Sequence, residues 1–187
     1  MKPAQKKRSI VLLSGGIDSA SCAHFLLSRG HDVHGLWIDY GQLASKQEQT
    51  SSLRVAAHLG IPRHIITMSG FADLGVGEHL GRNAMFVNAA MMFGGRQTST
   101  IALGIHAGTQ YYDCSAAFLR SITQLVSELT DGATTVVAPF VDWQKAEVVE
   151  YFRTTCIPIS FTYSCEIGTI PPCGKCLSCL DRTSLSL

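Results

Sequence analysis

Four cysteines near the C-terminus have the number and spacing of a metal site. They are Cys165, Cys173, Cys176 and Cys179. The last three form two overlapping Cys-x-x-Cys steps, and Cys165 completes the four thiolates of a tetrahedral zinc site. Zinc sites of this kind are structural, because they stabilise segments that have too few apolar residues to fold alone. The cysteines therefore predict structural zinc, and an iron–sulfur cluster is the alternative, since four cysteines can hold one too.

A glycine-rich turn near the N-terminus has the residue types of a phosphate-binding loop. Its sequence is Ser14-Gly15-Gly16-Ile17-Asp18-Ser19. Two glycines allow a tight turn in which successive backbone N–H groups approach an anion. A helix that begins near Asp18 adds the positive end of its dipole, and Ser14 and Ser19 add hydroxyl donors. We expect this turn to bind a pyrophosphate group; an ordinary strand-to-helix turn with Asp18 as its cap is the alternative.

Arg82, Lys145 and His106 could also contact a ligand. Arg82 follows a glycine at the start of an apolar helix, and its guanidinium can bind a phosphate or a carboxylate through two hydrogen bonds. Lys145 lies in the first turn of a predicted helix. His106 follows a predicted strand, at the end of the sheet where ligands bind. The structural alternatives are a surface cation for Arg82, a solvated helix start for Lys145 and a structural histidine.

Strands and helices that could position these side chains alternate along the chain. Short apolar runs with β-branched residues indicate strands at residues 9–13, 32–39, 63–67, 100–105 and 134–138. Helical patterns follow at residues 20–27, 45–59, 83–93, 116–129 and 144–152, the last of the regular helices. This alternation predicts a Rossmann-like α/β fold, a doubly wound, parallel five-stranded sheet with helices on both faces. Such sheets bind ligands beyond the carboxyl ends of their strands.

Length and composition limit the class of protein. The chain has 187 residues, 46% of them hydrophobic, and a formal net charge of +1. These values fit one domain with a real core, and they argue against disorder and against nucleic acid or an anionic membrane as the main partner. No apolar run is long enough to cross a bilayer, and Ile10–Leu13 is too short for a signal peptide. We therefore expect a cytoplasmic protein.

In that reducing compartment the seven cysteines should be thiols or metal ligands rather than disulfides. We expect Cys22 and Cys156, in and beside helices, to be buried small hydrophobes.

The composition changes after about residue 156, where Pro and Cys replace the apolar periodicity. We therefore divide the chain into a basic tail (1–8), an α/β domain (9–156) and a zinc-binding segment (157–187).

Motifs spread along the chain resemble a known family. The turn from Ser14 to Ser19 and the sequence Asp39-Tyr40-Gly41-Gln42 after the second strand resemble the pyrophosphate-loop ATPases of the adenine nucleotide alpha-hydrolase-like fold. Within that superfamily the chain is most similar to the QueC family of 7-cyano-7-deazaguanine synthases. The motifs that carry this resemblance are Gly81-Arg82-Asn83, Tyr112-Asp113-Cys114, Pro139 with Lys145-Ala146-Glu147, and Thr162-Tyr163-Ser164-Cys165.

The resemblance implies a ligase that forms a carbon–nitrogen bond and releases AMP and pyrophosphate. Its members convert 7-carboxy-7-deazaguanine and ammonia into 7-cyano-7-deazaguanine (preQ0), a precursor of queuosine, through an acyl adenylate and an amide. The implied cofactors are structural Zn²⁺ and the Mg²⁺ that accompanies ATP. The resemblance also implies a homodimer.

The resemblance assigns roles to particular residues. The implied ATP contacts are Leu13, Ser14, Gly15, Gly16, Asp18, Ser19, Asp39, Tyr40, Gln42, Arg82, Gly104 and Lys145. Four of them would act on the reacting phosphates: Ser14, Asp18, Ser19 and Lys145. The implied substrate contacts are Arg82, Asn83, His106, Tyr112 and Asp113. The Asp113 carboxylate would accept hydrogen bonds from ring N–H groups, and the four cysteines of the C-terminal cluster would be the zinc ligands.

The chain departs from the family pattern on the substrate side. The segment 69–81 is shorter, Ser115 replaces an arginine, and Leu43-Ala44 replaces Arg-His. Three alternatives to the synthase therefore stay open. One is a ligase that joins the activated carboxylate to another amine, such as one on a protein, in defence or secondary metabolism. Another is an ATP-binding regulator without catalysis. A thiolase that modifies tRNA is disfavoured by the charge of +1 and by cysteines committed to a metal.

Overall fold

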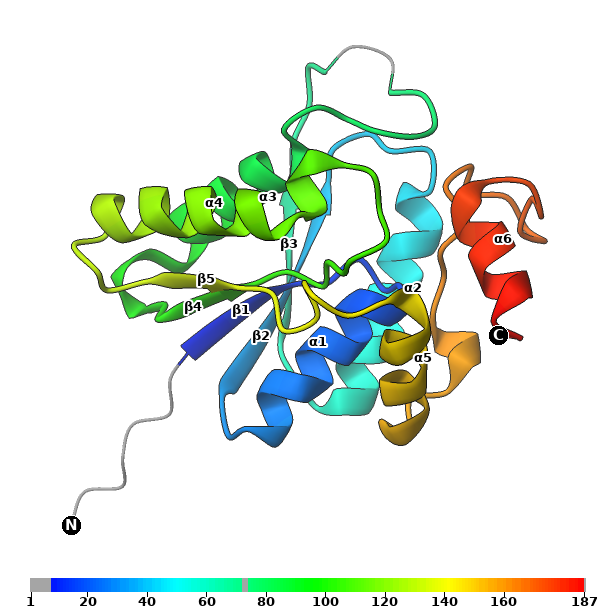
Figure 1. The fold of residues 1–187 in the computed structure, drawn as a ribbon, viewed down its shortest axis with the longest axis horizontal. Helices are drawn as coiled ribbons and strands as arrows, with labels where there is room; N and C mark the ends of the chain where they lie inside the picture. The colour runs from blue at the N-terminus through cyan, green and yellow to red at the C-terminus, as the bar shows by residue number, and fades with distance from the viewer. Residues whose placement is uncertain (1–7, 72–73, 187) are drawn as a thin grey trace.

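The computed structural model of the chain describes residues 8–71 and 74–186. Within these residues it has one sheet of five parallel strands in the order β3-β2-β1-β4-β5 (Figure 1). The strands are β1 (Arg8–Leu12), β2 (Asp32–Asp39), β3 (Arg63–Thr67), β4 (Thr100–Ala102) and β5 (Thr135–Val137). The order reverses at β1, which has β2 on one side and β4 on the other. This confirms the predicted doubly wound α/β fold.

Helices cover both faces of the sheet. The described residues form α1 (Ile17–Ser28), α2 (Ser45–Leu59), α3 (Arg82–Gly94), α4 (Ala116–Leu129), α5 (Lys145–Thr154) and α6 (Leu177–Ser184). Apolar residues of α1, α2 and α5 form one core cluster with Val11 and Phe140. Those of α3 and α4 form a second cluster on the opposite face, with Ile10 and Ile101. Ile157, at the start of the predicted zinc-binding segment, joins the first cluster.

Beside small shifts in the bounds of several elements, the structure differs from the sequence expectations most clearly at three places. The fourth strand ends at Ala102 rather than at residue 105, because the chain turns away to pass the first turn of α1. The helix at 144–152 is not the last one, since α6 begins after Cys176 and contains Cys179 (Figure 1). Cys22 is buried as predicted, whereas Cys156 is exposed, because it lies in the turn after α5 with a positive φ of 58°.

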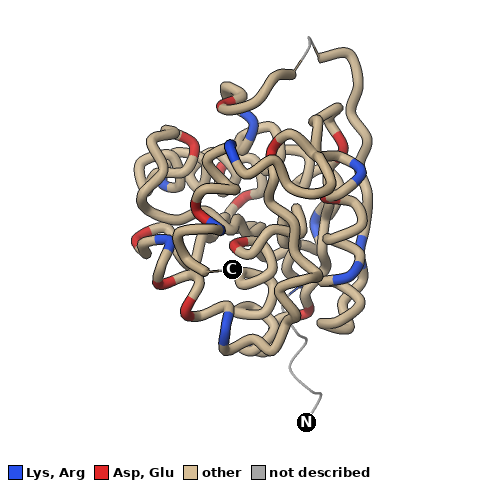
Figure 2. The backbone as a smooth tube through the Cα atoms, turned by 90° about the vertical axis from the view of Figure 1, so that its right-hand side faces the viewer, with Lys and Arg blue, Asp and Glu red and all other residues tan. Residues whose placement is uncertain are grey.

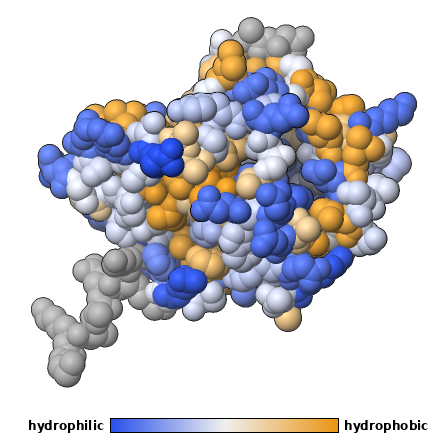
Figure 3. Space-filling view, viewed as in Figure 1, coloured by the Kyte–Doolittle hydropathy of each residue, from blue (hydrophilic) through white to orange (hydrophobic). Residues whose placement is uncertain are grey.

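The described surface is mixed in character. On the side shown in Figure 2, Lys and Arg are interspersed with Asp and Glu, so this side has no extended basic face. The face shown in Figure 3 has separate apolar areas divided by polar surface. Among the described residues, no helix is both long enough and apolar enough to cross a membrane.

Candidate functional site

The glycine turn follows β1 directly and is packed against α2. Gly15 has a φ of +87°, and a Cβ atom on it would lie 2.5 Å from the backbone nitrogen of Ser52. Only glycine fits both the conformation and the contact. The Gly15 N–H donates to Ser19 Oγ (3.2 Å), and the two hydroxyl oxygens of Ser14 and Ser19 lie 3.1 Å apart. The turn therefore gathers backbone N–H groups and hydroxyls at the N-terminus of α1, as a phosphate site requires.

The same turn lies at the point where the strand order reverses. Gly104 follows β4, and a Cβ atom on it would lie 2.6 Å from the carbonyl carbon of Asp18. The backbone after β4 therefore passes directly over the start of α1. His106 is buried near this point, and its Nδ1 hydrogen-bonds to the carbonyl oxygen of Ala107. That bond leaves Nε2 as the uncommitted ring nitrogen of His106.

Lys145 reaches the phosphate loop from the other end of the chain. Its Nζ lies 2.6 Å from both carboxylate oxygens of Asp18. The side chains of Lys145 and Asp18 are 23% and 27% exposed, so the pair is partly shielded from water. Gln144 and Glu147 form a capping box that starts α5 at Lys145. This cap fixes the position from which Lys145 extends to Asp18.

Arg82 begins α3 and lies near Tyr40, Asp113 and Cys114. Burial by itself lowers the pKa of Arg82, but the neighbouring Tyr40, Asp113 and Cys114 outweigh it and raise that pKa. Burial raises the pKa of Tyr40, while Arg82 opposes the shift. Arg82 Nε is buried without a hydrogen-bond partner among the described residues. The side chain is therefore a half-buried cation whose Nε has unused donor capacity.

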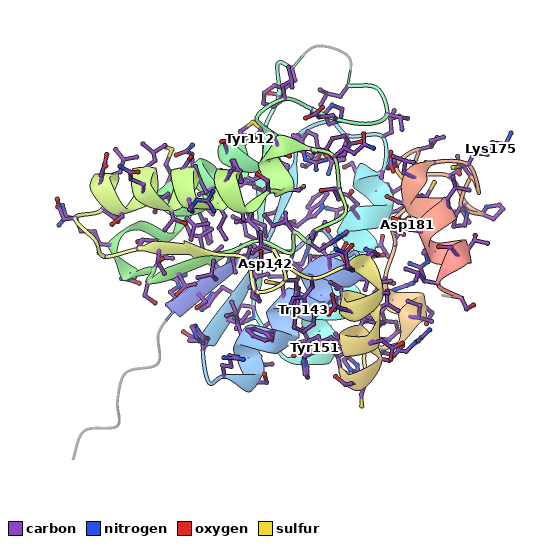
Figure 4. All side chains as sticks on the ribbon, viewed as in Figure 1. Tyr112, Asp142, Trp143, Tyr151, Lys175 and Asp181 are labelled. Carbon is purple, nitrogen blue, oxygen red and sulfur yellow. The ribbon has the colours of Figure 1, made fainter. Side chains whose placement is uncertain are left out.

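Asp113 and Asn83, both predicted substrate contacts, are bonded to each other. The Asn83 backbone N–H donates to Asp113 Oδ2 (3.2 Å), and Asn83 Nδ2 donates to the Asp113 carbonyl oxygen (3.0 Å). Both residues are buried. Asp113 therefore fixes the N-terminus of α3, and the Asn83 amide positions the loop before α4. Tyr112 beside them is 62% exposed and is labelled on this loop in Figure 4.

A cavity lies beyond the carboxyl end of β2, between α2, the segment before α3 and the cysteine segment. Its volume is about 60 Å³. The lining residues are Tyr40, Gln42, Leu43, Ala44, Glu48, Gly75, Val76, Gly77, His79, Arg82 and Glu166. The Gln42 side chain accepts from Tyr40 N–H (2.9 Å) and donates to Glu48 Oε2 (2.8 Å). Asp39 accepts from Gly41 N–H and so shapes the turn after β2.

Sequence reasoning included Tyr40, Gln42 and Arg82 but missed Glu48, His79 and Glu166. Glu48 had a signal, because it is the single acidic residue of the predicted helix 45–59 and lies in its first turn. Glu166 had none, since its position depends on how the cysteine segment packs. One of its carboxylate oxygens accepts from the backbone N–H and the hydroxyl of Ser178.

The four cysteines come together as the sequence predicts. Their sulfur atoms all lie within 4.8 Å of one another, and Cys173 Sγ is 3.8 Å from Cys179 Sγ. The backbone N–H of Cys173 donates to Cys165 Sγ. Burial opposes ionisation of Cys165, but this bond and that from Ile167 outweigh it and lower its pKa to about 5. Four sulfur atoms at this spacing fit one tetrahedral ion; a cluster of several iron atoms would hold them further apart.

The cysteine segment also contacts the phosphate loop and α2. The Tyr163 N–H donates to the Gly15 carbonyl oxygen (3.1 Å). Gln47 Nε2 donates to the Gly168 carbonyl oxygen (3.2 Å), and Gly168 lies against the backbone of Leu43 and Ala44. The predicted metal site and the predicted nucleotide site are thus parts of one packed unit.

Comparisons with known proteins give a family and relatives to which the chain is similar. The model of the family described as queuosine biosynthesis protein QueC matches residues 8–80 and 79–185. The chain is 32% identical to the 7-cyano-7-deazaguanine synthase of Parasynechococcus marenigrum (strain WH8102), over 207 aligned positions that cover 95% of this chain and 91% of that protein. It is 29% identical to the synthase of Paracoccus denitrificans (strain Pd 1222), covering 94% and 86%.

Two solved structures share the fold at low sequence identity. A 4-thiouridine synthetase bound to RNA and ATP has a TM-score of 0.60 and 20% identity, covering 83% of this chain and 42% of that one. The U34-tRNA thiolase NcsA from Methanococcus maripaludis, with its [4Fe-4S] cluster, has a TM-score of 0.59 and 13% identity, covering 98% of this chain and 65% of that one.

The alignment with the Parasynechococcus synthase has 207 positions, whereas this chain has 187 residues. That relative therefore has residues with no counterpart here.

Proposed function

Because the chain belongs to the QueC family, we propose that it is an ATP-dependent ligase that converts 7-carboxy-7-deazaguanine and ammonia into 7-cyano-7-deazaguanine. The observation that carries this proposal is the phosphate loop with Lys145 on Asp18, 2.6 Å from each oxygen, together with a cavity lined by the half-buried Arg82. Together these features supply a site for a nucleotide and a site for a carboxylate.

The reaction needs positioning and charge stabilisation more than a nucleophilic side chain. The substrate carboxylate attacks the α-phosphorus of ATP, pyrophosphate leaves, and the acyl adenylate is formed. Ammonia then attacks the carbonyl carbon and AMP leaves, which gives the amide. A second adenylation of the amide oxygen, followed by loss of AMP and a proton, gives the nitrile. Gly15, Gly16, Ser14 and Ser19 would bind the phosphates, and Lys145 would exchange Asp18 for a phosphate oxygen.

Two metal ions belong to this proposal. Mg²⁺ bound with ATP neutralises charge on the leaving pyrophosphate, and Asp18 is the carboxylate of the loop that could hold it. Zinc on the four cysteines would keep Tyr163 against the phosphate loop and would play no part in the chemistry. We also propose that the enzyme is cytoplasmic, and that it is a homodimer, as its family resemblance implies.

A ligase with a different acceptor is the second candidate. Two observations favour it: the alignment with the relative from Parasynechococcus is longer than this chain, and the two parts of the family match meet at residues 79–80, beside the cavity. Such an enzyme would form the same acyl adenylate and pass the acyl group to another amine, including one on a protein.

One incubation separates these candidates. The metal-loaded protein is mixed with ATP, Mg²⁺, ammonium and 7-carboxy-7-deazaguanine, and small products and intact protein are followed by mass spectrometry. The proposal predicts the nitrile with about two AMP per turnover, one for each adenylation. Release of AMP without the nitrile would favour the other acceptor, and an added mass on a protein would identify it. Binding of ATP without AMP release would contradict both ligase candidates and would favour an ATP-binding regulator without catalysis.

A further inference from the structure

His106 is a buried histidine whose ring keeps one basic nitrogen accessible. Its Nδ1 bonds to the Ala107 carbonyl oxygen, which can only accept, so Nδ1 carries the proton of the neutral ring. Nε2 therefore carries the lone pair, and no partner bonds to it in the described part of the chain. Nε2 is not among the fully enclosed polar atoms of that part either, so it keeps contact with solvent.

The direction of the His106 side chain follows from the alternation of residues along β4 and the segment after it. Ile101, Leu103 and Ile105 pack in the core cluster with α3 and α4. Gly104 lies on the opposite side, against the start of α1. Successive residues of an extended chain point to opposite faces of a sheet. His106 therefore shares the face of Gly104, which is the face that α1 and α5 cover.

Two close backbone approaches place His106 beside the phosphate loop. A Cβ atom on Gly104 would lie 2.6 Å from the carbonyl carbon of Asp18, and one on Gly108 would lie 3.3 Å from Gln144 Oε1. Residues two positions apart have Cα atoms at most about 7 Å apart, and His106 is two positions from each glycine. Gln144 directly precedes the lysine that is bonded to Asp18. His106 therefore lies between the start of α1 and the start of α5.

We propose that His106 is the general base for the attack of ammonia, with Nε2 as the atom that accepts the proton. This inference rests on the proposed function. The nitrogen of ammonia bonds to the carbonyl carbon of the acyl adenylate, and one proton passes from that nitrogen to Nε2. The bond from this carbon to the AMP oxygen then breaks, and AMP leaves with the electron pair. The products are the amide and AMP, and His106 releases the proton to solvent.

Asp18 is the carboxylate nearest to this position in the phosphate loop, and it is less suited to the role. A general base needs a free lone pair within hydrogen-bond reach of the proton that it takes up. Both oxygens of Asp18 are bonded to Lys145, whereas His106 Nε2 has no bond to break in the described part of the chain. The His106 ring is also fixed in one tautomer, so its basic nitrogen has a set direction.

The test separates adenylation from the ammonia step in the wild-type chain, in His106→Gln and in His58→Gln as the matched control. His58 is exposed on α2. Without ammonium, exchange of labelled pyrophosphate into ATP in the presence of 7-carboxy-7-deazaguanine reports adenylation. With ammonium, mass spectrometry reports the amide and the nitrile. Glutamine cannot take up the proton, so His106→Gln should keep the exchange and slow amide formation about 100-fold or more. The control should keep both rates.

A comparison of H₂O with D₂O needs only the wild-type chain, so it decides the matter even where His106→Gln does not fold. Amide formation should be slower in D₂O because a proton moves in that step. Pyrophosphate exchange should keep its rate, since no proton moves during adenylation. Equal effects of D₂O on the two steps would contradict the role of His106.

The outcomes also separate this inference from the proposed function. If His106→Gln forms the amide at the wild-type rate, or loses exchange and amide formation equally, His106 is not the base and the function stands. If the wild type shows exchange but makes no amide, the acceptor amine is a different one and the ammonia step proposed here does not occur. If the wild type shows neither, the proposed function fails and this inference fails with it.

Discussion

Lys145 Nζ is bonded to both carboxylate oxygens of Asp18, at 2.6 Å each, although the two residues are 127 positions apart in the sequence. Each lies in the first turn of its helix, Asp18 in α1 and Lys145 in α5. In the proposed function an incoming triphosphate would compete with Asp18 for Lys145, whose charge the ion pair holds in place.

The first prediction concerns this lysine. Lys145→Met should lower the rate of AMP release by about 100-fold or more, because it removes a positioned charge from the reacting phosphates. Lys46→Met is the matched control, since Lys46 is exposed on α2 and should leave the rate unchanged. Rates are measured with saturating acceptor, and circular dichroism checks that each variant is folded. Equal rates of AMP release in the two variants would show that Lys145 does not act on the reacting phosphates.

The second prediction concerns the glycine of the phosphate loop. Gly15→Ala should lower the unfolding free energy by about 3 kcal/mol or more. The added Cβ would lie 2.5 Å from the backbone of α2, and the φ of Gly15 is +87°. Gly30 has a similar φ of +81° but no atom within 4 Å of its Cβ position, so Gly30→Ala should cost only about 1–2 kcal/mol. Urea denaturation measures both. Equal losses would show that the packing against α2 does not matter.

The third prediction concerns the metal. The purified chain should hold about one zinc ion, Cys176→Ser should lose it, and Cys156→Ser should keep it because Cys156 is exposed and outside the cluster. Removal of the metal with a chelator should also weaken ATP binding, since Tyr163 N–H is bonded to Gly15. Elemental analysis and calorimetry provide the readouts. Iron with a visible absorption band would favour the cluster instead.

The fourth prediction concerns pH. Burial lowers the pKa of His64 from 6.5, and the nearby His34 and Arg8 add to the shift. His34 Nδ1 and His64 Nε2 lie 3.1 Å apart, a contact that one shared proton satisfies and a second would disrupt. The unfolded chain therefore binds more protons below about pH 6.5, and the folded state loses stability as the pH falls. Unfolding free energies from pH 8 to pH 5 should fall less steeply in His64→Gln than in the wild type; parallel curves would contradict this.

Much of the fold follows from local patterns. The bounds of β2, α2, β3 and α4 agree with the sequence expectation. Apolar periodicity acts within a few residues, and so do the residues that end or begin a helix. Gly60 ends α2, and Ser115 caps the start of α4. Helix α6 was missed, since its eight residues are largely polar. Its start depends on Glu166, which accepts from the Ser178 N–H across the cysteine loop. Such a long-range cap leaves no local signal.

The candidate site also has some parts that local sequence predicts and others that depend on long-range packing. The phosphate loop lies within one short stretch of sequence, and the cysteine set lies within another. The spacing of the residues within each stretch is therefore enough to predict its chemistry. The cavity joins α2, the segment before α3 and Glu166, and no single motif contains these parts. The partnership of Asp113 with Asn83 also depends on packing, because two loops 30 residues apart must meet. Sequence reasoning could nominate such residues without telling a ligand contact from an internal bond.

The bond between Asn83 and Asp113 has a consequence for how this protein could diversify. It fixes the start of α3 from the loop before α4, so the position of Arg82 does not depend on the length of the connection that leads from β3. Lengthening such a connection costs little, about 0.6 kcal/mol for each doubling. Insertions and deletions in that connection can therefore reshape the entrance of the cavity while the half-buried Arg82 keeps its place at the start of α3.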